Sequence, residues 1–155
     1  MAGTKFSEIF DLFMVKIKDW RLQALFDSSV TDFENYLTGF LVLAVPNFAP
    51  VCVQSLAYNE GTKEFTLELS LENKVILSQL MVENWLAKEV QDVNQMNLHL
   101  MDRDFKIYSE AQNLKEKSLH LDKVKEYNSL AITSYSYLHT INWSNWLSGN
   151  FFPTS

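Results

Sequence analysis

The chain has 155 residues, of which 47% are hydrophobic, and its single cysteine excludes an intramolecular disulfide framework or a zinc site built from several cysteines. This length fits one domain, because about 70% of the unfolded surface of such a chain can be buried, and the composition excludes a disordered or collagen-like chain. The net charge of -6 argues against a general nucleic-acid binder, which needs clustered Lys and Arg to replace the counterions of the phosphates.

The first predicted element is an amphipathic helix over residues 6–17. Its apolar positions recur at steps of three and four residues, and charged residues occupy the other face and interrupt any secretory signal. Thr4 is expected to cap the N-terminus, with Glu8 in the first turn. The apolar stripe consists of Phe6, Ile9, Phe10, Phe13, Met14 and Ile17.

The second predicted helix begins near Thr31, because Thr31 and Glu34 have the spacing of a capping box. Pro46 and Pro50 are expected to end it. Residues 35–59 carry no charge and are long enough on paper to span a bilayer, but Gly, Pro, Asn and Gln interrupt them. A buried helix followed by a break explains this run better than a transmembrane helix. Its buried face is Phe33, Tyr36, Leu37, Phe40, Leu41 and Ala44.

A short β-hairpin is predicted between the second and third helices. The apolar residues of 65–69 alternate with polar ones, and residues 59–61 form a turn between this run and residues 51–53. Ser70 then begins the third helix, which is expected to run to about Val90. The apolar face of this helix is broad enough for burial on more than one side, and it consists of Ile76, Leu77, Leu80, Met81, Trp85 and Leu86.

The fourth predicted helix is the longest, running from about Asp104 to Tyr135, or about 45 to 50 Å at 1.5 Å per residue. Such a helix is longer than a globule of this size needs, so it is expected to find a neighbour. Its apolar stripe consists of Ile107, Ala111, Leu114, Leu121, Val124, Ala131 and Tyr135, and the polar residues Ser118 and Asn128 occupy two further positions of the same stripe.

The prediction is therefore a mainly α protein with a four-helix bundle-like domain over residues 1–137 and an irregular aromatic tail over residues 138–155, which carries no Lys, Arg, Asp or Glu. One core is expected to contain Phe10, Phe13, Phe40, Met81, Trp85, Phe105 and Tyr108.

No pattern in the sequence indicates catalysis, a cofactor or a metal. His99, His120 and His139 lie about twenty residues apart without the spacing of a metal site. Asp102 and Asp104 are interpreted as a helix cap, and Cys52 as a small apolar side chain without a basic neighbour. The glycines are isolated, so no phosphate loop is present.

The assembled pattern resembles the head–tail adaptor proteins of tailed bacteriophages, also called connector or head-completion proteins. The resemblance covers about residues 6–130 and is spread over all four predicted helices. It is carried by Ser7-Glu8-Ile9-Phe10, Phe13, Lys16, Ile17, Asp19, Phe48, Cys52, Leu56, Phe65, Leu69-Ser70, Ile76-Leu77, Met81-Val82, Trp85-Leu86, Asp102, Asp104-Phe105-Lys106, Tyr108-Ser109, Ala111, Leu114 and Lys115.

The resemblance implies a structural, non-enzymatic component of the virion neck, assembled in the cytoplasm of the bacterial host. It implies a ring of twelve identical subunits beneath the portal protein, which extends the DNA channel and docks the stopper or tail-completion protein. Genomic DNA would pass through without specific binding, and no membrane is involved. The acidic composition agrees, because a negative wall repels phosphates.

Two alternatives to the adaptor stay open: a small cytoplasmic helical regulator that binds a protein, and, less favoured, an enzyme. The tail is expected to dock on the portal or the adjacent subunit, because a tail after a long projecting helix would emerge far from the core; folding back on its own domain is the alternative. The residues expected to make this contact are Tyr137, Trp143, Trp146, Phe151 and Phe152.

Overall fold

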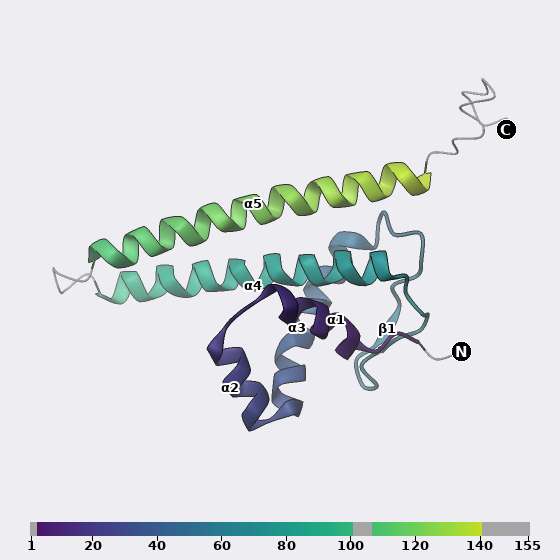
Figure 1. The fold of residues 1–155 in the computed structure, drawn as a ribbon, viewed down its shortest axis with the longest axis horizontal. Helices are drawn as coiled ribbons and strands as arrows, with labels where there is room; N and C mark the ends of the chain where they lie inside the picture. The colour runs from purple at the N-terminus through teal and green to yellow at the C-terminus, as the bar shows by residue number, and fades with distance from the viewer. Residues whose placement is uncertain (1–2, 101–106, 141–155) are drawn as a thin grey trace, which may run out of the picture.

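The computed structural model describes residues 3–100 and 107–140 of the chain. Two long antiparallel helices, α4 (Leu71–Leu100) and α5 (Ile107–Thr140), lie along one another, and the shorter elements pack beside the half of α4 that begins at Leu71 (Figure 1). The described part of the chain is thus mainly helical with one small hairpin, as predicted. None of its helices is long and apolar enough to cross a membrane.

Helix α1 (Phe6–Lys16) has the predicted extent, but its cap differs from the prediction. Lys5 is the N-cap residue, and its backbone N–H donates to the Glu8 carboxylate at 3.2 Å. Thr4 is instead fully buried, and its hydroxyl accepts a hydrogen bond from the Leu69 N–H at 2.7 Å. The Thr4 hydroxyl therefore joins the N-terminal segment to the segment before α4, a contact between residues too far apart for local sequence rules to predict.

Helix α2 (Trp20–Ser28), which is capped by Asp19, is an additional helix that was not predicted. Its sequence has little overall hydrophobicity, and of its nine residues only Leu22 is buried, so the apolar stripe that marks the other helices is missing. A helix of this length is marginal alone and depends on its tertiary contacts.

Helix α3 (Val30–Phe48) begins before the predicted cap, because the Ser29 hydroxyl and not Thr31 accepts from the Asp32 N–H at 3.2 Å. The prediction that Pro46 ends this helix was also wrong. Pro46 lies inside it, and the helix continues to Phe48 because Val45 and Phe48 are buried in the core. Their burial offsets the hydrogen bond that proline cannot donate. The predicted buried face is confirmed apart from Tyr36, which is half-buried.

The hairpin consists of β1 (Tyr58–Asn59) and β2 (Glu64–Phe65), which pair antiparallel with Tyr58 opposite Phe65. It is shorter than predicted, since residues 51–53 form no strand and Leu67 is exposed. The N-terminal segment completes this region through a bridge between Lys5 and Glu64. Gly3 is required there because a Cβ atom would lie 1.7 Å from the Phe65 carbonyl oxygen.

Helix α4 begins after Ser70, as predicted, but runs ten residues beyond the predicted end at Val90. The neighbour that the long helix α5 needs is therefore α4 of the same chain, which continues beside it (Figure 1). The predicted stripe of α5 is confirmed where the structure describes it: Leu121, Asn128 and Tyr135 are buried, and Val124 and Ala131 are half-buried.

One core joins α1, α3, the hairpin, α4 and the second half of α5. Of the predicted core residues, Phe10, Phe13, Phe40 and Met81 are buried, whereas Trp85 is half-buried against the core. The side chains of Phe105 and Tyr108 lie outside the described residues.

Candidate functional site

The molecule divides into two regions with different packing. The base comprises residues 3–89 and 121–140, and the arm comprises residues 90–100 and 107–120, where α4 and α5 extend beyond α1–α3 (Figure 1). Every buried apolar side chain among the described residues belongs to the base. In the arm, each described side chain is half-buried or exposed. In the arm, α4 and α5 therefore pack mainly against each other.

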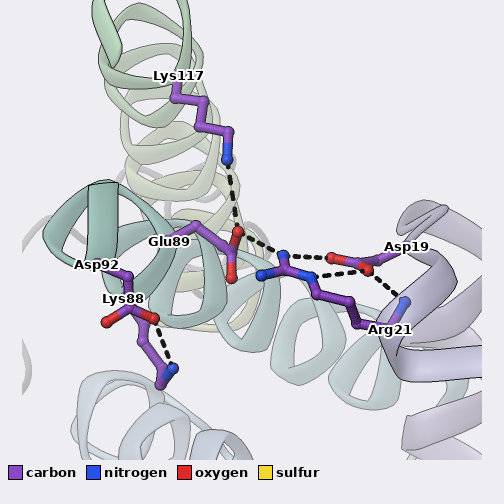
Figure 2. A network of polar contacts seen from close by, with 6 residues as sticks. All are labelled: Asp19, Arg21, Lys88, Glu89, Asp92 and Lys117. Carbon is purple, nitrogen blue, oxygen red and sulfur yellow. Dashed lines mark hydrogen bonds and ion pairs between the residues drawn. The ribbon is translucent and has the colours of Figure 1, made fainter. Parts of the chain in front are cut away.

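A network of charges lies where the arm leaves the base (Figure 2). At its centre is Glu89 of α4, which is only 5% exposed. Its Oε2 accepts hydrogen bonds from Arg21 Nη2 of α2 at 2.6 Å and from Lys117 Nζ of α5 at 3.4 Å. Arg21 also binds the Asp19 carboxylate at 2.7 Å, and this carboxylate caps α2. The network therefore joins three helices around one buried carboxylate.

Asp19 and Arg21 stabilise each other's ionised forms. The hydrogen bond from Arg21 holds the pKa of Asp19 below its ordinary value, and Asp19 together with Glu89 raises the pKa of Arg21. A hollow of about 130 Å³ lies beside the network and is lined in part by Trp85 and Tyr36. Because Asp19, Arg21 and Glu89 are engaged with one another, the arrangement fixes α2 against the long helices and presents no free acid or base.

This network was not predicted from the sequence. Arg21 and Glu89 are separated by 68 residues, and Glu89 lies 28 residues from Lys117. The signal available in the sequence was Asp19 two residues before Arg21, a typical N-cap arrangement that would also have revealed α2.

The last turns of α5 pack against the base, which corrects the expectation that the tail emerges far from the core. The Tyr135 ring packs edge-on against Phe48 at 5.0 Å, and its hydroxyl accepts from the Val53 N–H at 3.2 Å. Burial raises the pKa of Tyr135. His139 lies 3.2 Å from the carboxylate of Glu72 in the first turn of α4. Because α5 runs antiparallel to α4, its C-terminal end returns to the base (Figure 1).

The opposite side of α5 presents exposed apolar side chains, which we call the α5 outer face: Leu119, Leu130 and Tyr137. Leu119, Leu130 and Tyr137 are spaced by eleven and seven residues, so at about 100° per residue they lie within about 20° of one direction. This direction is opposite the buried stripe of Leu121 and Asn128. Tyr137, predicted to contact a partner, lies on this face and is 61% exposed.

Four other residues predicted to contact a partner, Trp143, Trp146, Phe151 and Phe152, lie outside the described residues. Helix α5 ends at Thr140, three residues beyond the predicted domain boundary at 137, so residues 138–140 are helical and not part of an irregular tail as predicted. The rest of the predicted tail lies outside the described residues. The α5 outer face extends along the helix to the point where this segment begins.

The histidines are not brought together. His120 lies on the middle of α5 and His139 near its end, and within residues 3–100 and 107–140 no three side chains of His, Cys, Asp or Glu form a group that could hold a metal ion. Asp102 and Asp104 lie outside the described residues. The Cys52 thiol lies 3.8 Å from the Tyr135 hydroxyl, in the apolar setting that its neighbours predicted.

No family model matches the sequence, and no curated protein or solved structure matches it. Function is therefore inferred from the residues and geometry of the chain itself.

Proposed function

We propose that the chain is a head–tail adaptor of a tailed bacteriophage: a non-enzymatic virion protein that forms a ring beneath the portal, extends the DNA channel and joins the capsid to the stopper or tail. Its location would be the virion neck, reached after assembly in the bacterial host. The proposal rests on the sequence resemblance together with the shape and surface of the long helices.

The observation that carries the proposal is the α5 outer face. Exposed apolar side chains that share one direction of a helix are typical of protein interaction sites. The exposed Glu126 points in the same direction, between Leu119 and Leu130, so the face combines apolar area with a charge. The face leads into residues 141–155, which contain two Trp and two Phe residues and no charged residue. Aromatic side chains in uncharged segments are typical anchors of protein interfaces.

The arrangement of α5 supports a role in partner binding. The base is rigid, and the residues predicted to bind a partner come after the end of α5 in the sequence. Tyr135 and His139 fix the end of α5 to Phe48 and Glu72, so a partner bound to the tail would be held at a defined distance from the core. A connector that transmits load between two assemblies needs such an attachment.

The proposal is tested by quantifying the chain in purified phage particles. Mass spectrometry of particles should find the chain at the same copy number as the portal protein, and electron microscopy should place its density beneath the portal. Absence of the chain from purified particles would contradict the adaptor and favour the protein-binding regulator.

A second experiment tests the residues assigned to the contact. Deleting residues 141–155, which leaves α5 complete, should give a folded protein that fails to attach to portal-bearing heads. On the α5 outer face, Tyr137→Asp should weaken attachment about tenfold or more, because it places a charge in an apolar interface. The matched control is Leu43→Asp on α3, since Leu43 is 60% exposed and Tyr137 is 61% exposed. Normal attachment of both the truncated protein and the Tyr137→Asp variant would contradict the assignment.

A further inference from the structure

A groove of about 370 Å³ lies between α1, α4 and α5, on the base and at the first turn of α5 beyond it. Val82 and Val124 provide its apolar floor together with the Tyr127 ring. Its basic side chains are Lys16, His120 and Lys123. No carboxylate lines the groove itself, but Asn128 of its lining donates a hydrogen bond to the Glu83 carboxylate at 2.8 Å. In a chain of net charge -6, the charged side chains that line this groove are therefore two lysines.

The two lysines of this groove form no ion pair within the described residues. Lys63, Lys74, Lys88 and Lys117 each form an ion pair, whereas Lys16 and Lys123 do not, a property they share with exposed lysines elsewhere such as Lys18 and Lys125. Lys16 Nζ instead donates to the buried Ser78 hydroxyl at 2.8 Å, and partial burial of this ammonium lowers the pKa of Lys16 to about 8. A carboxylate entering the groove would compensate this desolvation.

The chain carries a surface of complementary character at the corner between α2 and α3. Residues 22–62 contain no Lys or Arg. At the corner, Phe26 and Val30 are 44% and 52% exposed, and the exposed Asp27 and Asp32 lie beside them without an ion pair among the described residues. In Figure 1 this corner projects from the side of α4 opposite α5. One molecule cannot therefore place its own corner in its own groove.

We propose that the α2–α3 corner of a second copy of the chain docks in this groove, with Phe26 and Val30 on its apolar floor and Asp27 and Asp32 beside Lys16 and Lys123. The contact joins two different surfaces, so it is heterologous, and repetition of such a contact generates a closed ring or an open filament. The inference rests on the proposed function, because it specifies how neighbouring subunits of the ring meet.

The test uses two charge-reversal variants of the full chain, Lys123→Glu in the groove and Asp27→Lys at the corner. Both residues are exposed, so circular dichroism should confirm the wild-type fold. Sedimentation velocity at low salt should show self-association of the wild-type chain and a monomer for each variant alone. Equal amounts of the two variants should associate again, because the intact corner of one variant meets the intact groove of the other, and the reversed charges of the remaining corner and groove again have opposite signs.

The matched controls are Lys125→Glu on α5 and Asp11→Lys on α1, which reverse exposed charges outside the groove and the corner and should associate like the wild type. Higher salt should weaken the association, because the charges at the rim are screened. A wild-type monomer at every soluble concentration, variants that associate like the wild type, or a mixture that stays monomeric would each overturn the proposal.

These outcomes are separable from failure of the adaptor function. Particles that contain the chain at portal copy number and incorporate both charge variants normally would retain the adaptor and overturn the docking contact. A chain that associates through groove and corner but is absent from particles would retain the contact and contradict the adaptor. A wild-type monomer whose Lys123→Glu variant alone fails to attach to heads would assign the groove to a different acidic protein.

Discussion

The base and the arm are built from the same two helices but are stabilised differently. In the base, α4 is covered by α1, α3 and α5, and fully buried residues such as Phe13, Leu77 and Met81 lie inside one core. In the arm, α4 and α5 pack chiefly against each other, and Leu114 is half-buried whereas Leu119 is exposed. Buried apolar area therefore stabilises the base, and the arm depends on its connection to the base.

The charge network around Glu89 marks the boundary between these regions. The network lies where α4 is no longer covered by apolar side chains of the base. At this point α2 and α5 contact α4 through ion pairs with Glu89 (Figure 2). The difference between the two regions indicates that a long helical hairpin can extend beyond a small domain if polar side chains cover the helices at the domain boundary. The following substitutions test that interpretation.

The largest effect is expected in the base. Phe13→Ala should reduce the free energy of unfolding by about 3 to 5 kcal/mol, because Phe13 is fully buried and its removal leaves a cavity. Leu119→Ala in the arm should change it by less than about 0.5 kcal/mol, since Leu119 is exposed. Chemical denaturation followed by circular dichroism measures both, and equal losses would contradict the distinction between the regions.

An intermediate effect is expected at the boundary. Arg21→Met leaves the buried Glu89 with only the longer contact to Lys117, and should reduce the free energy of unfolding by about 2 kcal/mol. The double variant Arg21→Met with Glu89→Met should be more stable than Arg21→Met alone, because no unpaired carboxylate stays buried. The comparison is made by denaturant unfolding at neutral pH. A double variant less stable than Arg21→Met would show that Glu89 stabilises the chain without Arg21, through its contact with Lys117.

A small effect, limited to alkaline pH, is expected at Lys16. Its pKa in the folded chain is about 8, below the ordinary value of 10.5, so between these pH values the unfolded chain binds more protons. The free energy of unfolding of the wild-type chain should therefore rise with pH across this window relative to Lys16→Met, which lacks the group. Because the side chain is exposed overall, we expect the difference to stay below about 1 kcal/mol.

The measurement for Lys16 is denaturant unfolding of both proteins from pH 7 to pH 10.5, at a concentration where both are monomeric. Parallel stability curves would show that the ammonium is solvated in the folded chain. Lys18→Met provides the control, since Lys18 is exposed on the segment between α1 and α2.

Local sequence patterns determined the type and most of the positions of the helices, because apolar residues at helical spacing specify both the helix and its buried face. Phe10 and Phe13 on α1, Phe40 on α3 and Tyr135 on α5 occupy the core as their periodicity predicts. The turn at residues 59–61 also follows local chemistry, since Asn59 Oδ1 accepts from the Gly61 N–H at 2.8 Å.

Tertiary structure decided what depends on residues far apart in the chain. The role of Thr4 is set by Leu69, the continuation of α3 past Pro46 by the core around Phe48, and the course of α4 beyond Val90 by α5 beside it. Ion pairing of Glu89 with Arg21 and Lys117 belongs to the same class. Hydrophobic periodicity indicates which face of a helix is buried but not which element covers that face. The packing partner of each helix and the residue at which it ends are therefore determined only when the helices pack.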